Sequence, residues 1–212
     1  MQIALCSLIG YFFGNINPAY IISRFRGFDI RERGSGNAGA SNVTMVMGKK
    51  AGLFTAIFDI LKAAVVTSIS VTLFPNLKYA KILAGSSCIL GHIFPILMKF
   101  HGGKGLACLA GMMISYDSQL FLTILVIELF LGLGFDYICI VPMSGSLLFT
   151  LIYAVSTGDP SGTLILAAVS LVILHKHIEN IYRIQNGTEA HISFLWKKDK
   201  EIERIREHEH CN

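Results

Sequence analysis

The sequence predicts an all-α integral membrane protein with about seven transmembrane helices. Of its 212 residues, 53% are hydrophobic and only 15% are charged, whereas a soluble domain carries about 25% charged residues. The apolar residues form separate runs, several close to the roughly 20 residues that a helix needs to cross a bilayer. These observations exclude a disordered chain, a coiled coil and an ordinary soluble enzyme. We expect one polytopic membrane domain over residues 1–195 and a charged cytoplasmic tail over residues 196–212.

Seven apolar segments supply the expected helices. They cover residues 3–23, 51–74, 82–98, 106–115, 119–134, 137–155 and 163–181. Long runs separated by breaks favour helices, because the strands of a membrane barrel would show only short alternating segments. The fourth segment is too short to cross a hydrocarbon core of about 30 Å as a helix, so we expect it to be re-entrant or a half-helix.

The loop charges predict the orientation. With the N-terminus outside, 15 of the 18 lysines and arginines fall on the cytoplasmic side, only Lys78 and Lys81 fall outside, and Lys62 lies within a segment. Such an excess of basic residues is typical of cytoplasmic loops. It predicts an outside N-terminus, a cytoplasmic C-terminus and an odd number of crossings. That parity fails if the fourth segment does not cross, unless another segment also drops out.

The cysteines and the net charge narrow the range of partners. The five cysteines show no C-x-x-C spacing, and four lie in apolar runs, where a free thiol behaves as a small hydrophobic side chain. We therefore expect no disulfide framework, no metal and no cofactor. The net charge of +4 is mild. We expect membrane lipids and no nucleic acid as partners, and the sequence leaves the oligomeric state open.

A first glycine-rich stretch, residues 33–42, reads Arg-Gly-Ser-Gly-Asn-Ala-Gly-Ala-Ser-Asn. Its glycines allow positive φ angles and close approach of a ligand, and successive N–H groups in such turns can bind an anion. Ser35, Asn37, Ser41 and Asn42 add neutral polar groups. The alternative is a flexible connector between two helices.

A second stretch, residues 102–105, reads Gly-Gly-Lys-Gly and opens a helix. Glycines can expose N–H groups, a helix N-terminus adds positive potential, and Lys104 supplies a charge, so the stretch resembles a phosphate cradle. It lacks the spacing of a Walker A loop. We expect His92 and Pro95 to shape the end of the preceding helix.

A third stretch, residues 175–189, follows the last apolar segment. His177 and Asn180 are three residues apart and share a helix face, while Glu179 points elsewhere. A histidine that is protonated, or held in one tautomer, can donate to a phosphate. The alternative is an ordinary helix end, because charges at the ends of membrane helices are common.

Three charges lie inside the apolar segments. Asp59 and Lys62 are three residues apart, and buried charges of this kind are costly and usually paired or close to water. A functional and a purely structural pair are equally open. Glu128 is a third such charge, and the sequence identifies no partner for it.

Three blocks together resemble a known family, in that family's order: GSGNAGASN at 34–42, GHIFPILMKFHGGKG at 91–105 and HIENIYRIQNGTE at 177–189. The sequence resembles the PlsY family, the bacterial acyl-phosphate-dependent glycerol-3-phosphate acyltransferases, over about residues 10–194. The resemblance implies a multi-pass enzyme of the bacterial cytoplasmic membrane whose motifs lie at the cytoplasmic face.

The resemblance also implies an activity and a set of site residues. The expected reaction transfers a fatty acyl group from acyl phosphate to the 1-hydroxyl of glycerol 3-phosphate, and it releases lysophosphatidic acid and phosphate. The leaving phosphate is thought to accept the hydroxyl proton in the family. The catalytic positions carried over are Ser35, Lys104, His177 and Asn180. The substrate-binding positions are Gly36, Asn37, Gly39, Asn42, Gly102, Gly103 and Glu179.

Four positions depart from the family pattern. Met45 stands where the family usually has an arginine, and Asp136, Cys139 and Pro142 stand in place of a second arginine and two serines. Arginine binds phosphate through charge-assisted, bidentate hydrogen bonds. A diverged member with another acceptor, or without catalysis, is therefore an open alternative.

A different class of function is also open. The same loops could serve a membrane protein that binds or transports a phosphorylated metabolite, although no internal repeat of the kind frequent in transporters is evident. An acyltransferase with an HxxxxD pair is disfavoured, because no histidine is followed by an aspartate at that spacing.

Overall fold

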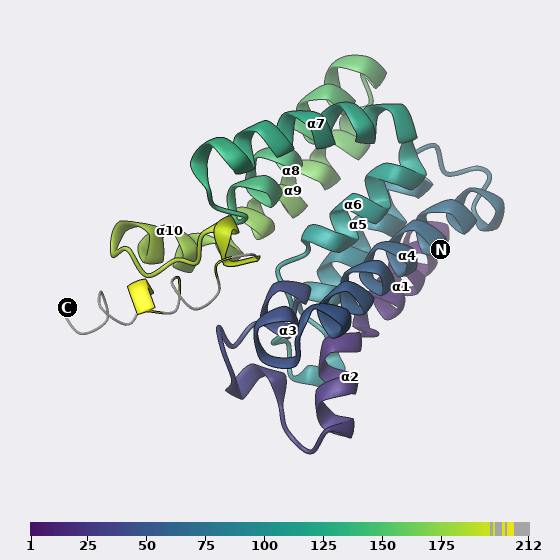
Figure 1. The fold of residues 1–212 in the computed structure, drawn as a ribbon. Helices are drawn as coiled ribbons and strands as arrows, with labels where there is room; N and C mark the ends of the chain where they lie inside the picture. Colours follow the sequence, from purple (N-terminus) through teal and green to yellow (C-terminus); the bar gives the residue numbers. More distant parts are fainter. Residues whose placement is uncertain (196, 198–200, 202, 206–212) are drawn as a thin grey trace.

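The computed structural model describes residues 1–195, 197, 201 and 203–205, and these residues form helices and loops without a strand (Figure 1). The α-helices are α1 (Gln2–Asn15), α2 (Pro18–Phe25), α3 (Ala40–Met47), α4 (Lys49–Leu73), α5 (Ala80–Ile93), α6 (Leu106–Tyr116), α7 (Ser118–Phe135), α8 (Ile140–Thr157), α9 (Pro160–Lys176) and α10 (Ile178–Gln185), with short 3-10 turns η1 (Ile30–Glu32), η2 (Ile96–Met98) and η3 (Ile192–Leu195). Helices α1, α4, α5 and α6 pack into one group, and α7, α8 and α9 form a second group that joins it through α5 and α6.

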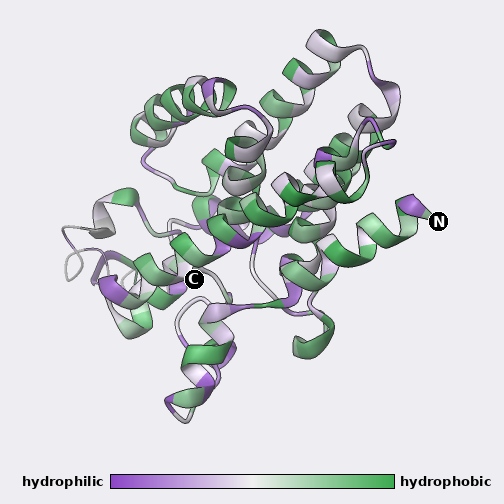
Figure 2. Ribbon diagram, turned by 90° about the vertical axis from the view of Figure 1, so that its right-hand side faces the viewer, coloured by the Kyte–Doolittle hydropathy of each residue, from purple (hydrophilic) through white to green (hydrophobic). Residues whose placement is uncertain are grey.

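Six helical stretches in the described part of the chain are long and apolar enough to cross a membrane. They are Gln2–Phe25, Lys49–Leu73, Ala80–Met98, Ser118–Phe135, Ile140–Thr157 and Pro160–Gln185, and the shorter α6 is also apolar. Figure 2 shows hydrophobic residues along these helices and more hydrophilic ones in the connections. Many large apolar side chains face outward, among them Leu61, Phe130 and Leu164. This arrangement confirms the predicted all-α membrane class.

The first apolar segment forms two helices, because Pro18 interrupts it. Proline has no N–H group, so the carbonyl of Gly14 loses the donor that a continuous helix would supply. The Lys62 ammonium of α4 donates to this carbonyl at 3.2 Å and to the neighbouring carbonyl of Ile16 at 2.6 Å. Backbone groups at membrane depth need a protein partner, and Lys62 meets that need.

Helix α6 is short because the loop before it turns into the bundle. Its 11 residues span about 16 Å. At its start, the N–H of Gly103 donates to the carbonyl of His92 in the last turn of α5 at 3.1 Å. At its end, Lys81 from the first turn of α5 donates to the carbonyl of Ser115 at 2.8 Å. One end of α6 therefore lies beside the last turn of α5, and the other end lies beside the first turn of α5. A short fourth segment is thus compatible with the seven expected transmembrane segments.

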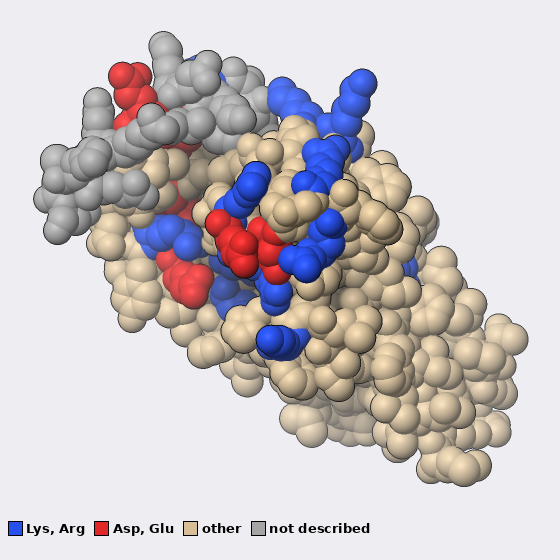
Figure 3. All heavy atoms as spheres, turned by 90° about the horizontal axis from the view of Figure 1, so that it is seen from below, with Lys and Arg blue, Asp and Glu red and all other residues tan. Residues whose placement is uncertain are grey.

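Charged side chains gather at one end of the molecule. Figure 3 shows lysine and arginine atoms around a hollow in which acidic side chains also lie, and most of the remaining visible surface is uncharged. The loop from α2 to α3, the loop from α5 to α6 and the junction of α9 with α10 meet at this end. The predicted orientation places it in the cytoplasm.

Part of the C-terminal tail packs back onto this end. Glu201 is only 6% exposed, and it accepts the N–H of His191 at 2.8 Å and the guanidinium of Arg204 at 2.6 Å. Arg204 also donates to the carbonyl of Glu189 at 2.6 Å and to that of Gly187. These tail residues are docked rather than solvated. The last residues of the charged tail expected over 196–212, including His208 and His210, lie outside the described residues.

Candidate functional site

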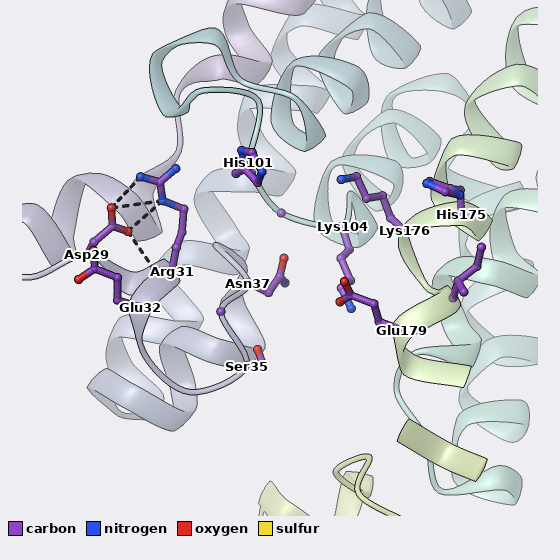
Figure 4. Close-up of a pocket in the computed structure, with 14 residues that line it drawn as sticks. Asp29, Arg31, Glu32, Ser35, Asn37, His101, Lys104, His175, Lys176 and Glu179 are labelled. Carbon is purple, nitrogen blue, oxygen red and sulfur yellow. Dashed lines mark hydrogen bonds and ion pairs between the residues drawn. The ribbon is translucent and has the colours of Figure 1, made fainter. Parts of the chain in front are cut away.

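Three segments that are far apart in the sequence meet in one pocket of about 550 Å³ (Figure 4). They are the three polar stretches singled out from the sequence. The lining residues are Asp29, Arg31, Glu32, Ser35, Gly36, Asn37, His101, Gly102, Gly103, Lys104, His175, Lys176, Ile178 and Glu179. The pocket therefore mixes five basic side chains with three acidic ones, next to two glycine-rich loops.

Asn42 shapes the first loop from behind. Its side chain is 1% exposed, its Nδ2 donates to three loop carbonyls at 2.9–3.2 Å, and its Oδ1 accepts the N–H of Ser35 at 2.9 Å. Gly39 is the N-cap residue of α3. Neither residue lines the pocket, whereas Ser35, Gly36 and Asn37 do. The first loop thus exposes its tip and buries its anchor.

An ion pair forms another wall of the pocket. The Arg31 guanidinium lies 2.7 Å from the Asp29 carboxylate and also donates to the carbonyl of Met98 at 2.7 Å. The hydrogen bond from Arg31 lowers the pKa of the Asp29 carboxyl. Both side chains are therefore charged at neutral pH, and the pair ties the first loop to η2.

The second loop uses two of its N–H groups within the protein. The N–H of Gly102 donates to the carbonyl of Ile93, and that of Gly103 to the carbonyl of His92, each at 3.1 Å. These amides were expected to cradle a phosphate, but in this structure they are already engaged. The amides of Lys104 and Gly105 make no backbone hydrogen bond within the described part of the chain. The Lys104 side chain and the amides that follow Gly103 are therefore the groups of this loop that remain available to an anion.

A chain of polar contacts fixes Lys104 over the third segment. Its ammonium donates to Asn180 Oδ1, Asn180 Nδ2 donates to Glu189 at 2.6 Å, and Glu189 accepts Arg183 Nε at 2.7 Å. Burial lowers the pKa of the Lys104 ammonium, and the Arg183 charge lowers it further. The result is a partly desolvated cation with a fixed direction.

His177 and Asn180 share a buried face, as the sequence predicts, and Glu179 is exposed. The Nδ1 atom of His177 lies 2.7 Å from the carbonyl of Ile173. Because a carbonyl only accepts, Nδ1 carries the proton and Nε2 is the free acceptor of the neutral ring. His177 does not line the pocket, whereas Glu179 does, with its carboxylate 3.9 Å from Arg183.

Seven residues of the pocket lining were not among the site residues assigned from the sequence. They are Asp29, Arg31, Glu32, His101, His175, Lys176 and Ile178. His175 and Lys176 stand directly before the third block, and His101 directly before the two glycines, so their proximity to the motifs was the available signal. Lys176 places its ammonium 4.6 Å from the ring centre of Phe94, which holds it beside the second loop.

The four departures from the family pattern lie outside the pocket lining. Met45 is half-buried on α3, and Cys139 and Pro142 are buried at the start of α8. Asp136 accepts the N–H of Ile192 through its carbonyl at 2.9 Å. It thus links the α7–α8 turn to the segment after α10, a structural contact rather than a phosphate contact.

One group of three metal-ligand-type side chains occurs among the described residues. Asp59, His92 and Cys108 are buried, and their ligand atoms lie within 4.8 Å of one another. The sequence did not suggest this group, because its members come from three helices. The Lys62 ammonium lies 2.6 Å from the Asp59 carboxylate and already neutralises its charge. A metal ion there would have to displace Lys62.

The fold and the pocket together define a polytopic membrane protein with a pocket of mixed charge at one end of its helix bundle. Comparison with known proteins makes the class specific. The family model described as glycerol-3-phosphate acyltransferase matches residues 4–187, and the chain belongs to that family.

Individual relatives agree with this assignment. The chain is 34% identical over 197 residues to a glycerol-3-phosphate acyltransferase of Bacillus subtilis strain 168, covering 92% of this chain and 100% of the relative. It is similar to the crystal structure of PlsY, an integral membrane glycerol 3-phosphate acyltransferase, in the glycerol 3-phosphate form, with a TM-score of 0.83, 27% identity and coverage of 92% and 98%. The comparison with the lysophosphatidic acid form gives a TM-score of 0.79 and 27% identity, and it covers 90% of this chain and 95% of that one. The predicted resemblance is confirmed.

Proposed function

We propose that the protein transfers a fatty acyl group from acyl phosphate to the 1-hydroxyl of glycerol 3-phosphate, at the cytoplasmic face of a bacterial cytoplasmic membrane. The products are lysophosphatidic acid and inorganic phosphate. The observation that carries the proposal is the Lys104 ammonium, which lies in a pocket built from all three segments and is directed by Asn180. A fixed, partly desolvated cation is suited to a phosphate-bearing acceptor.

The reaction needs positioning and charge compensation more than a strong base. The acceptor hydroxyl oxygen attacks the carbonyl carbon, the bond from that carbon to the phosphate oxygen breaks, and the leaving phosphate takes the hydroxyl proton. Both substrates are anions, so the pocket must offset their repulsion. Lys104 and Lys176 supply positive charge around it, whereas the charge of Arg31 is matched by Asp29. Holding two reactants in the right geometry supplies a large part of the acceleration.

We assign Lys104 to the phosphate of glycerol 3-phosphate, and Ser35 and Asn37 to hydrogen bonds from the opposite wall. Asn180 orients Lys104. His177 is assigned to the site by its family resemblance, and Nε2 is the nitrogen that it can offer to a substrate. These roles are consistent with the pocket lining and with the contact between Lys104 and Asn180.

The test is phosphate release from palmitoyl phosphate by the purified protein in detergent. We expect release that depends on glycerol 3-phosphate, with an equal amount of lysophosphatidic acid formed, and none of this product when palmitoyl-CoA replaces the donor. Binding of glycerol 3-phosphate without phosphate release would instead indicate a binding or transport protein. Release that depends on a different polyol phosphate, and not on glycerol 3-phosphate, would indicate another acceptor.

A further inference from the structure

A buried ionic cluster lies directly behind the second glycine loop. Its members, Asp59 and Lys62 of α4 and His92 of α5, are 1%, 5% and 3% exposed. The Lys62 ammonium lies 2.6 Å from the Asp59 carboxylate, and His92 Nδ1 lies 3.1 Å from Lys62 and 3.4 Å from Asp59. Charges at membrane depth are costly even when they are paired, and the proposed reaction uses none of these groups.

The His92 ring connects this cluster to the loop. Its Nδ1 edge faces the ion pair, and its Nε2 edge lies against Gly103, where an added Cβ would fall 2.1 Å from Nε2. An added Cβ on Gly102 would fall 2.0 Å from the His92 carbonyl, and that carbonyl also accepts the Gly103 N–H at 3.1 Å. The two glycines therefore lie flat on His92, immediately before Lys104.

The end of α5 is held in place by α1 as well as by α4. Lys62 donates to the carbonyls at the break after α1. Asn15 Oδ1 accepts the N–H of Ile96 at 2.6 Å, and the Tyr11 hydroxyl donates to the carbonyl of Phe94 at 2.7 Å. The segment that carries His92 is thus anchored to two other helices, which gives the ring a defined position under the loop.

We propose that His92, oriented by the Asp59–Lys62 pair, is a positioning residue for Lys104. Its ring sets how far the Gly102–Gly103 turn lies from the end of α5. This distance determines where the Lys104 ammonium meets the substrate phosphate. The two glycines are then required because they make room for the ring, and not only because a ligand approaches them. The inference rests on the proposed function for its kinetic readout.

The first experiment is a double-mutant cycle between His92→Ala and Gly103→Ala in the full-length protein. We expect Gly103→Ala alone to lower kcat/KM for glycerol 3-phosphate by roughly 10- to 100-fold, because small displacements of a positioned group are costly to catalysis. Removing the ring makes room for the added methyl group, so the double variant should be no slower than His92→Ala alone. Additive losses would overturn the proposal, because they would show that Gly103 is required independently of the ring.

A second set of variants separates positioning from folding. Combining Asp59→Asn with Lys62→Gln removes both charges together, keeps an amide donor at position 62 for the carbonyls of Gly14 and Ile16, and frees the ring from the ion pair. We expect KM for glycerol 3-phosphate to rise about tenfold while the melting temperature stays close to that of the parent. The matched control is Glu128→Gln, which alters a buried acid on α7 that pairs with Ser144 at 2.6 Å and does not reach the loop. Unchanged kinetics in the double variant, or an equal loss in the control, would contradict the proposal.

Binding of glycerol 3-phosphate, measured by calorimetry, gives a readout that needs no acyl donor. If the parent binds glycerol 3-phosphate but does not release phosphate from palmitoyl phosphate, the proposed function fails. The positioning role is still tested by the same cycle in that case. If Gly103→Ala weakens the binding of glycerol 3-phosphate and the addition of His92→Ala restores it, the positioning role is supported. If the two substitutions weaken binding independently, the positioning role is overturned.

Discussion

Lys104 has an environment unlike that of its neighbour Lys99. Its ammonium is half-buried and directed by Asn180, whereas Lys99 is exposed at the end of η2. Charge–charge attraction is stronger where the effective dielectric constant is lower. An ammonium at position 104 therefore attracts an anion more strongly than an ammonium at position 99.

Lys104→Ala should lower kcat/KM far more than Lys99→Ala. The loss of one charge-assisted contact of about 1.5–3 kcal/mol corresponds to roughly 10- to 150-fold. Steady-state kinetics with glycerol 3-phosphate as the varied substrate measure the difference. If Lys104→Ala were as active as the parent, Lys104 would not belong to the site.

The pH dependence should also depend on Lys104. An ammonium is charged below its pKa, and the pKa of Lys104 is lowered from 10.5 by burial and by Arg183. As pH rises, kcat/KM for glycerol 3-phosphate should therefore fall earlier than loss of an ordinary lysine charge would cause. Lys104→Arg stays charged throughout this range and should keep its own rate to higher pH. Identical alkaline limbs in the two proteins would assign the titration to another group.

Met45 tests how far the departures from the family have changed the site. It lies on α3 and does not line the pocket. We expect Met45→Arg to lower KM for glycerol 3-phosphate by about tenfold, because one charge-assisted bond to phosphate contributes about 1.5–3 kcal/mol. Met45→Leu is the control for repacking. An unchanged or higher KM would show that the site is rebuilt for another acceptor or lies beyond the reach of residue 45.

At the scale of the structural elements, the described tail residue Arg204 is connected to the site through hydrogen bonds with the turn after α10. Arg204 donates to the carbonyls of Gly187 and Glu189, and the Glu189 side chain holds Asn180. The turn after α10 is therefore fixed from both sides. Its geometry can influence Lys104 although none of the described tail residues lines the pocket.

Arg204→Ala should accordingly lower kcat/KM by roughly 3- to 10-fold, a loss equivalent to one hydrogen bond of about 0.5–1.5 kcal/mol. The matched control is Glu203→Ala, which changes the exposed neighbouring residue. Kinetics on both purified variants give the comparison. Equal activity of Arg204→Ala and Glu203→Ala would show that the tail does not support the site.

At the scale of the whole molecule, the pocket lies where the two groups of helices approach the charged end. Helices α5 and α6 carry the second loop between them, and α9 with α10 brings the third segment to it. The second loop turns back onto the end of α5 through the amides of Gly102 and Gly103 before α6 begins.

The orientation of this bundle can be measured by cysteine labelling. In a background without native cysteines, Ser41→Cys and Gln185→Cys should react with a membrane-impermeant thiol reagent only from the cytoplasmic side. Ser161→Cys should react only from outside, and this exposed position avoids Asp159, whose carboxylate caps α9. Labelling of positions 41 and 161 from the same side would overturn the predicted topology.

The class of protein and the three polar segments could be predicted because hydropathy, charge and glycine spacing are properties of neighbouring residues. The possible pairing of Asp59 with Lys62 was visible for the same reason, whereas the segment expected over residues 3–23 divides at Pro18 into two helices. The use of the Gly102 and Gly103 amides could not be predicted, because their acceptors belong to the end of another helix. Asn42 likewise proved to be an anchor of the loop, which only its hydrogen bonds reveal.

Sequence patterns alone predicted the all-α membrane class and the acyltransferase family, and both are confirmed. They also predicted basic loops on one side of the membrane and a central role for Lys104, which stay predictions. Which polar groups face the pocket and which support it from behind became visible once the packing of the helices was known. This packing placed Lys176 and His101 at the rim, His177 behind the lining, and His92 under the glycine turn. The physical reason is that burial and hydrogen bonding depend on contacts between segments that lie 30 to 80 residues apart, such as Lys62 with His92 and Lys104 with Asn180.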